Sequence, residues 1–113
     1  MSARRRGWAA PHEELAIVFC DDEKLVQKTN RIIVQLAGWN GKRCAYPQSS
    51  DELVDVLTRN RETWKRVIVL QDFELRGETA IECLQKTRAA GFGEDHVIFV
   101  VATAYMNKQH LRE

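Results

Sequence analysis

Arg66-Val-Ile-Val-Leu-Gln-Asp-Phe-Glu-Leu-Arg-Gly77 is the stretch on which the fold depends, because it is an apolar run that ends on one carboxylate, Asp72. Strands that are buried on both faces of a parallel sheet have this near-continuous apolar character. In open α/β domains the functional groups lie just past the carboxyl ends of such strands. Asp72 is therefore the first candidate for a functional residue.

Two more carboxylates, Asp21 and Asp22, follow the earlier apolar run Leu15-Ala-Ile-Val-Phe-Cys20. If both runs are parallel strands, all three acids meet at the same edge of the sheet. Mg²⁺ is commonly held by one or two carboxylates, waters and phosphate oxygens, so this cluster is suited to Mg²⁺. Taken singly, each acid has an ordinary structural explanation as a turn or cap residue, and Asp22 could cap a helix that begins near Lys24.

The rest of the chain alternates between helical and strand patterns. Apolar residues recur at helical spacing from Leu25 to Ala37, and Gly38 follows as a left-handed stop residue. Two capping-box patterns begin further helices, Ser49 with Glu52 and Thr79 with Glu82. Strands are expected at 15–20, weakly at 42–46, at 66–72 and at 97–102. This alternation predicts an α/β fold with a doubly wound parallel sheet.

The composition is that of one small domain of 113 residues with a formal net charge of +1. Such a balance argues against binding to nucleic acid or membrane through the overall field, and no apolar stretch reaches membrane-spanning length. Three widely spaced cysteines, Cys20, Cys44 and Cys83, are expected to be reduced packing residues. We expect a cytoplasmic protein whose residues 1–14 form a flexible basic arm.

Three motifs together resemble the receiver domain of two-component response regulators. They are Ile17-Val-Phe-Cys-Asp-Asp-Glu23, the run into Asp72 with the Phe-Glu-Leu-Arg-Gly that follows, and Val100-Val-Ala-Thr-Ala104. They occur in the family's order and with about its spacing, over 15–113. The resemblance implies a flavodoxin-like fold with strand order 2-1-3-4.

The resemblance also implies a role for each matching residue. Asp72 matches the phosphoacceptor, which takes a phosphoryl group from a histidine kinase or phosphotransfer protein. Asp22 and Asp21 match the acids that hold Mg²⁺ directly and through water, and the backbone carbonyl of Glu74 matches a third protein ligand. Thr103 matches the hydroxyl residue that contacts the phosphoryl group. Such a domain is not an enzyme, beyond promoting its own phosphorylation and dephosphorylation.

Some positions depart from the family pattern. Arg76 stands where Pro is usual and Ala80 where Gly is common, and Lys108 comes too early to match the family's phosphate-contacting lysine. The fifth strand and last helix have no counterpart in this sequence, so 97–101 would be an apolar sheet edge. We expect either a fragment of a longer regulator or a strand covered by a second copy or a partner.

Three functions remain open at this point. The first is a phosphorylatable receiver, and the second is a pseudo-receiver that acts as an interaction or dimerisation module without phosphorylation. The third is a small Mg²⁺-dependent phosphohydrolase, which is disfavoured because no second catalytic carboxylate closely follows Asp72.

Overall fold

The computed structural model describes residues 15–72, 74–75 and 77–102, and these form an α/β domain around an open parallel sheet. Four strands lie in the order β2-β1-β3-β6, with bounds β1 Leu15–Cys20, β2 Cys44–Ala45, β3 Arg66–Asp72 and β6 Val97–Ala102. All three neighbouring pairs are parallel. The predicted α/β class and the order 2-1-3-4, counted over the strands of this sheet, are confirmed.

The central strand β3 pairs along its length with both neighbours. In this register Cys20 of β1 lies opposite Gln71, and Asp72 lies opposite Ala102 of β6. The carboxyl ends of the three long strands therefore lie at one edge of the sheet. The register also places Asp72 one position beyond the point where β1 stops.

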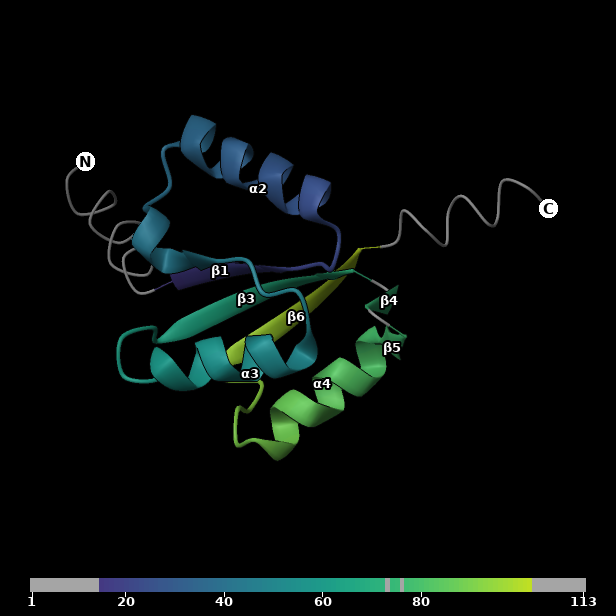
Figure 1. Cartoon of the computed structure of the whole chain (residues 1–113). Helices are drawn as coiled ribbons and strands as arrows, with labels where there is room; N and C mark the ends of the chain where they lie inside the picture. The colour runs from purple at the N-terminus through teal and green to yellow at the C-terminus, as the bar shows by residue number, and fades with distance from the viewer. Residues whose placement is uncertain (1–14, 73, 76, 103–113) are drawn as a thin grey trace.

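Helices cover the two faces of the sheet unequally. Helix α2 (Lys24–Ala37) lies alone on one face, whereas α3 (Ser50–Arg59) and α4 (Ala80–Ala89) lie side by side on the other (Figure 1). The buried core lies mainly under α3 and α4. Its largest fully buried apolar side chains are Phe92, Leu53, Leu57, Leu75, Val18, Val67, Val69 and Val97.

The face under α2 is more open than the sequence pattern predicts. Leu25 and Leu36 are 74% and 84% exposed, and on β6 Ile98 and Val100 are 53% and 46% exposed. Most of the apolar residues that recur at helical spacing in α2 are therefore exposed. Gln27 and Val34 are the buried residues of this helix.

Local signals for helix ends were mostly correct. Gly38 has a left-handed backbone with φ of 74°, and the Thr79–Glu82 capping box is complete. At the other predicted box Ser49 accepts from the backbone N–H of Glu52, but the Glu52 carboxylate accepts from Gln48 instead of returning to Ser49.

Two short features differ from the expected elements. The second strand is only Cys44–Ala45, because a 3₁₀ turn, η1 (Gly41–Arg43), occupies the preceding residues. After β3, the strands β4 (Glu74–Leu75) and β5 (Glu78–Thr79) form an antiparallel hairpin that the sequence did not predict. Within the described residues, no helix combines the length and apolarity needed to cross a membrane.

Candidate functional site

Asp21, Asp22 and Asp72 come together at the carboxyl edge of the sheet and form the candidate site. One carboxylate oxygen from each lies within 4.8 Å of the others, and all three side chains are half-buried. Asp72 is the last residue of β3, while Asp21 and Asp22 begin the loop between β1 and α2. Parallel pairing of β1 with β3 brings residues 50 positions apart in the sequence into one cluster.

Backbone hydrogen bonds hold the loop that carries two of these acids. The N–H of Asp21 donates to the carbonyl of Pro47 at 3.1 Å, which ties the loop to the segment after β2. The Asp21 carboxylate accepts from the N–H of Glu23 at 2.9 Å. Helix α2 begins with Glu23 as its N-cap, so Asp22 is not the N-cap that one reading of the sequence allowed.

Gln27 of α2 supports this loop from beneath. Its side chain is buried, and its Nε2 lies within hydrogen-bonding distance of three carbonyl oxygens. These belong to Phe19 at 2.7 Å, Asp21 at 3.1 Å and Pro47 at 3.0 Å. The amide thus joins the end of β1, the acidic loop and the β2–α3 connection, and a buried polar group with such partners fixes their relative positions.

The electrostatics of the cluster disfavour a full set of charges. Desolvation by burial raises the pKa of Asp21, and the neighbouring Asp22 raises it further, although the hydrogen bond from the Glu23 N–H acts in the opposite direction. Like charges at this spacing repel one another unless a counter-charge is present. A divalent cation would relieve this repulsion.

The donor set fits a hard divalent cation such as Mg²⁺. All three side chains offer hard oxygen atoms, which Mg²⁺ prefers, and their partial exposure leaves room for the waters that Mg²⁺ keeps. Soft metals would require thiolate or imidazole ligands. Among the described residues, no other cluster of three His, Cys, Asp or Glu side chains meets the same spacing.

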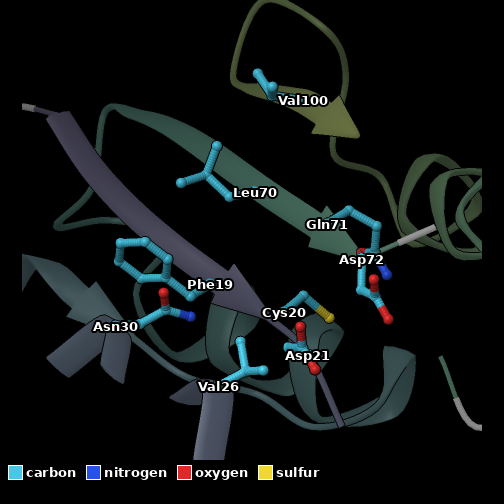
Figure 2. Close-up of a pocket in the computed structure, with 9 residues that line it drawn as sticks. All are labelled: Phe19, Cys20, Asp21, Val26, Asn30, Leu70, Gln71, Asp72 and Val100. Atoms are coloured by element: carbon cyan, nitrogen blue, oxygen red, sulfur yellow. The ribbon is translucent and has the colours of Figure 1, made fainter. Parts of the chain in front are cut away.

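A pocket of about 270 Å³ opens beside the acids, on the face of the sheet that α2 covers (Figure 2). Asp21 and Asp72 lie at its polar end. The remaining lining is largely apolar and comprises Phe19, Cys20, Val26, Asn30, Leu70, Gln71 and Val100. The acids therefore lie at one end of a pocket whose other walls are largely apolar.

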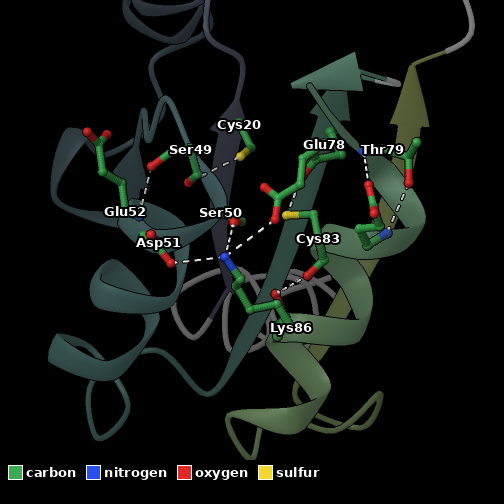
Figure 3. A network of polar contacts seen from close by, with 12 residues as sticks. Cys20, Ser49, Ser50, Asp51, Glu52, Glu78, Thr79, Cys83 and Lys86 are labelled. Carbon is green, nitrogen blue, oxygen red and sulfur yellow. Dashed lines mark hydrogen bonds and ion pairs between the residues drawn. The ribbon is translucent and has the colours of Figure 1, made fainter. Parts of the chain in front are cut away.

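On the α3/α4 face, one lysine joins the elements around the site. Nζ of Lys86 donates to Ser50 Oγ at 2.8 Å and forms ion pairs with Asp51 at 3.0 Å and Glu78 at 3.4 Å (Figure 3). The hydrogen bond to Asp51 is the main cause that raises the pKa of Lys86. This network connects the first turn of α3 to α4 and to β5 on the face of the sheet opposite α2.

Of two other predicted site residues, Glu74 is described only in its backbone and Thr103 is not described. The backbone of Glu74 begins β4, two residues after Asp72, whereas its side chain lies outside the described residues. Thr103 also lies outside them, and so do the basic arm 1–14 and residues 104–113. Thr103 directly follows Ala102, the register partner of Asp72.

The sequence reading missed two buried amides at this edge, Gln27 and Gln71. A signal was present for Gln71, because an amide inside an apolar strand must find a partner or a function. Gln27 gave no comparable signal, since its neighbours Leu25 and Val26 suggested a different buried face.

Comparisons with protein-family profiles, curated proteins and solved structures found no match to this chain.

Proposed function

We propose that this chain is a receiver domain in a two-component His-to-Asp relay, with Asp72 as the phosphoacceptor. The observation that carries the proposal is the convergence of the Asp21, Asp22 and Asp72 carboxylates within 4.8 Å at the carboxyl edge of a parallel sheet. The sheet order also agrees with the flavodoxin-like fold of receivers, which we propose for the whole domain.

In this proposal a carboxylate oxygen of Asp72 attacks the phosphorus of a phosphohistidine on a histidine kinase or phosphotransfer protein. The P–N bond breaks as the O–P bond forms, and the histidine keeps the electron pair and is then protonated. The product is an acyl phosphate. Positioning and charge neutralisation dominate the catalysis of phosphoryl transfer.

The other residues at the site have supporting roles. Asp21, Asp22 and Asp72, with the backbone carbonyl of Glu74, would hold Mg²⁺, which when bound neutralises charge on the transferring phosphoryl group. Gln27 donates to the Asp21 carbonyl of the acidic loop and to the Pro47 carbonyl of the β2–α3 connection, and so holds the loop in place. Thr103 is proposed to donate to a phosphoryl oxygen, so that phosphorylation changes the local surface and its protein contacts.

Intact-mass analysis with a small phosphodonor tests the proposal. Incubation with phosphoramidate and Mg²⁺ should add one phosphoryl group to the wild-type protein, and hydroxylamine should remove it. Asp72→Asn should remain unmodified, whereas Asp95→Asn, the same change in an exposed loop residue before β6, should be labelled like the wild type. Equal labelling of Asp72→Asn would refute the site, and labelling in EDTA would refute the need for a cation.

A second candidate function is a pseudo-receiver, an interaction module that works without phosphorylation. The specific observation in its favour is the exposed apolar surface of β6, where Ile98, Val100 and Val101 are all exposed. Among the described strands, β6 pairs only with β3, so its other edge offers backbone groups for a second copy or a partner strand. This candidate predicts specific binding by a protein that phosphoramidate does not label.

A receiver of either kind would work with cytoplasmic partners, and we propose the cytoplasm as its location. We propose no nucleic-acid contact by this domain, in view of its net charge of +1.

A further inference from the structure

Two cysteines and an amide lie together directly behind the acidic edge. Cys20 is the last residue of β1, Gln71 is its register partner on β3, and Cys83 lies in the first turns of α4. All three side chains are buried, with exposed fractions of 1%, 0% and 0%. Residues from three elements therefore meet at one point in the core.

These side chains contact one another through polar atoms. The Cys83 thiol donates to Gln71 Oε1 at 3.3 Å, and Cys20, the register partner of Gln71, belongs to the same buried cluster as Cys83. Figure 3 shows both sulfur atoms in the space between the end of β1 and α4. Nε2 of Gln71 is buried without a hydrogen-bond partner among the described groups.

Cys83 is the thiol with the lower pKa of the two. The neighbouring Cys20 thiol lowers the pKa of Cys83, and the charge of Lys86 one turn further along α4 acts in the same direction, while burial and the charge of Glu78 raise it. A position near a helix N-terminus also favours a thiolate. The unpartnered N–H of Gln71 would be available to an oxygen atom bound to sulfur.

We propose that a small peroxide oxidises Cys20 and Cys83 to a disulfide, and that this disulfide changes the affinity of the acidic cluster for a divalent cation. Cys83 attacks one peroxide oxygen, so the S–O bond forms as the O–O bond breaks and water leaves. Cys20 then attacks the Cys83 sulfur, the S–S bond forms as the S–O bond breaks, and the oxygen leaves in a second water. The thiols lose two hydrogen atoms in total, and hydrogen peroxide becomes two waters.

The place of the two cysteines in the fold gives their oxidation a consequence. Cys20 and Gln71 also line the pocket beside the acids, so this pocket reaches the residues next to Cys83. A disulfide draws its sulfur atoms to about 2.05 Å, so we expect the end of β1 and α4, which carry the two cysteines, to be drawn together. Asp21 and Asp22 directly follow Cys20 and would move with it. This second part rests on the proposed function.

Tryptic mapping tests the oxidation site, because the three cysteines fall in separate fragments, 7–24, 44–59 and 77–86. The full chain carrying Cys44→Ser should, after hydrogen peroxide, give fragment 7–24 linked to 77–86, and dithiothreitol should separate them. Adding Cys83→Ser should abolish the link. Circular dichroism checks the fold of each variant, and Cys83→Ala replaces Cys83→Ser if the latter does not fold. No linked fragment in folded Cys44→Ser, or links between different molecules only, would overturn the proposal.

Calorimetric Mg²⁺ titration of the same Cys44→Ser protein, reduced and oxidised, tests the coupling. We expect oxidation to weaken Mg²⁺ binding several-fold and dithiothreitol to restore it. Equal affinities in the two forms would overturn the coupling. If the reduced protein binds no Mg²⁺, the proposed function fails, while the disulfide mapping still decides the oxidation site by itself.

Discussion

The buried Nε2 of Gln27 lies 3.1 Å from the main-chain carbonyl oxygen of Asp21, so a residue of α2 holds the acidic loop through its backbone. The same amide reaches the carbonyls of Phe19 and Pro47. Asn30, one turn further along the helix, donates to Gln27 Oε1 at 3.1 Å and fixes the amide orientation. The acids are therefore positioned by side-chain contacts that lie beneath them.

Gln27→Met should destabilise the protein by about 2–4 kcal/mol, because it leaves buried carbonyls without a donor while nearly keeping the side-chain volume. Urea unfolding measures the loss. Gln35→Met is the matched control, since Gln35 is exposed on the same helix, and it should change stability by less than about 0.5 kcal/mol. Equal effects of the two substitutions would show that the hydrogen bonds of Gln27 do not stabilise the loop.

Asp21→Asn should stabilise the protein in EDTA at pH 7. The folded-state pKa of Asp21 is raised, mainly by desolvation, so the folded protein holds this proton more tightly than the unfolded chain does. The contribution of Asp21 to the free energy of unfolding therefore falls as the pH rises from its pKa in the unfolded chain through its pKa in the folded protein. Asn can still accept from the Glu23 N–H without carrying charge. Solvent screens a half-buried group, so we expect a gain of about 0.5–1 kcal/mol at most.

Urea unfolding of wild type and Asp21→Asn from pH 3 to pH 7 measures this difference. It should be largest at neutral pH and shrink toward acid pH, where both proteins are uncharged at this position. Glu94→Gln, which removes an exposed carboxylate in the turn before β6, should show no such trend. A variant less stable than the wild type at pH 7 in EDTA would contradict the raised pKa of Asp21 in the folded protein.

Ile98→Lys should reduce self-association if the free edge of β6 pairs with a second copy. Ile98 is 53% exposed and is the second residue of an uncharged strand, and lysine on an edge strand opposes strand addition. Sedimentation velocity over a wide concentration range provides the measurement. Ile81→Lys, at a 63% exposed position on α4, should sediment as the wild type does. A wild-type protein that stays monomeric at the highest concentration would count against this edge as an interface.

Much of the fold could be predicted from local patterns. Gly38 ends α2 and Thr79 begins α4 because their effects depend on residues within one turn. The two central strands could be predicted because their apolar runs fit a sheet covered on both sides. The meeting of Asp21 with Asp72 required only the rule that parallel strands end at a common edge.

What could not be predicted depends on contacts between distant residues. Helical spacing cannot say which face of α2 packs on the sheet, and the structure buries Gln27 while it exposes Leu36. Nor does spacing show that Cys20 and Cys83 meet across Gln71. The short hairpin of β4 and β5 has too few residues to produce a strand pattern of its own.

The most direct test of the central claim is a crystal structure with Mn²⁺, an anomalous scatterer that accepts the same oxygen ligands as Mg²⁺. The proposal predicts one strong anomalous peak between the carboxylates of Asp21, Asp22 and Asp72. A peak elsewhere, or no peak at these acids under saturating Mn²⁺, would contradict the claim that they share one cation.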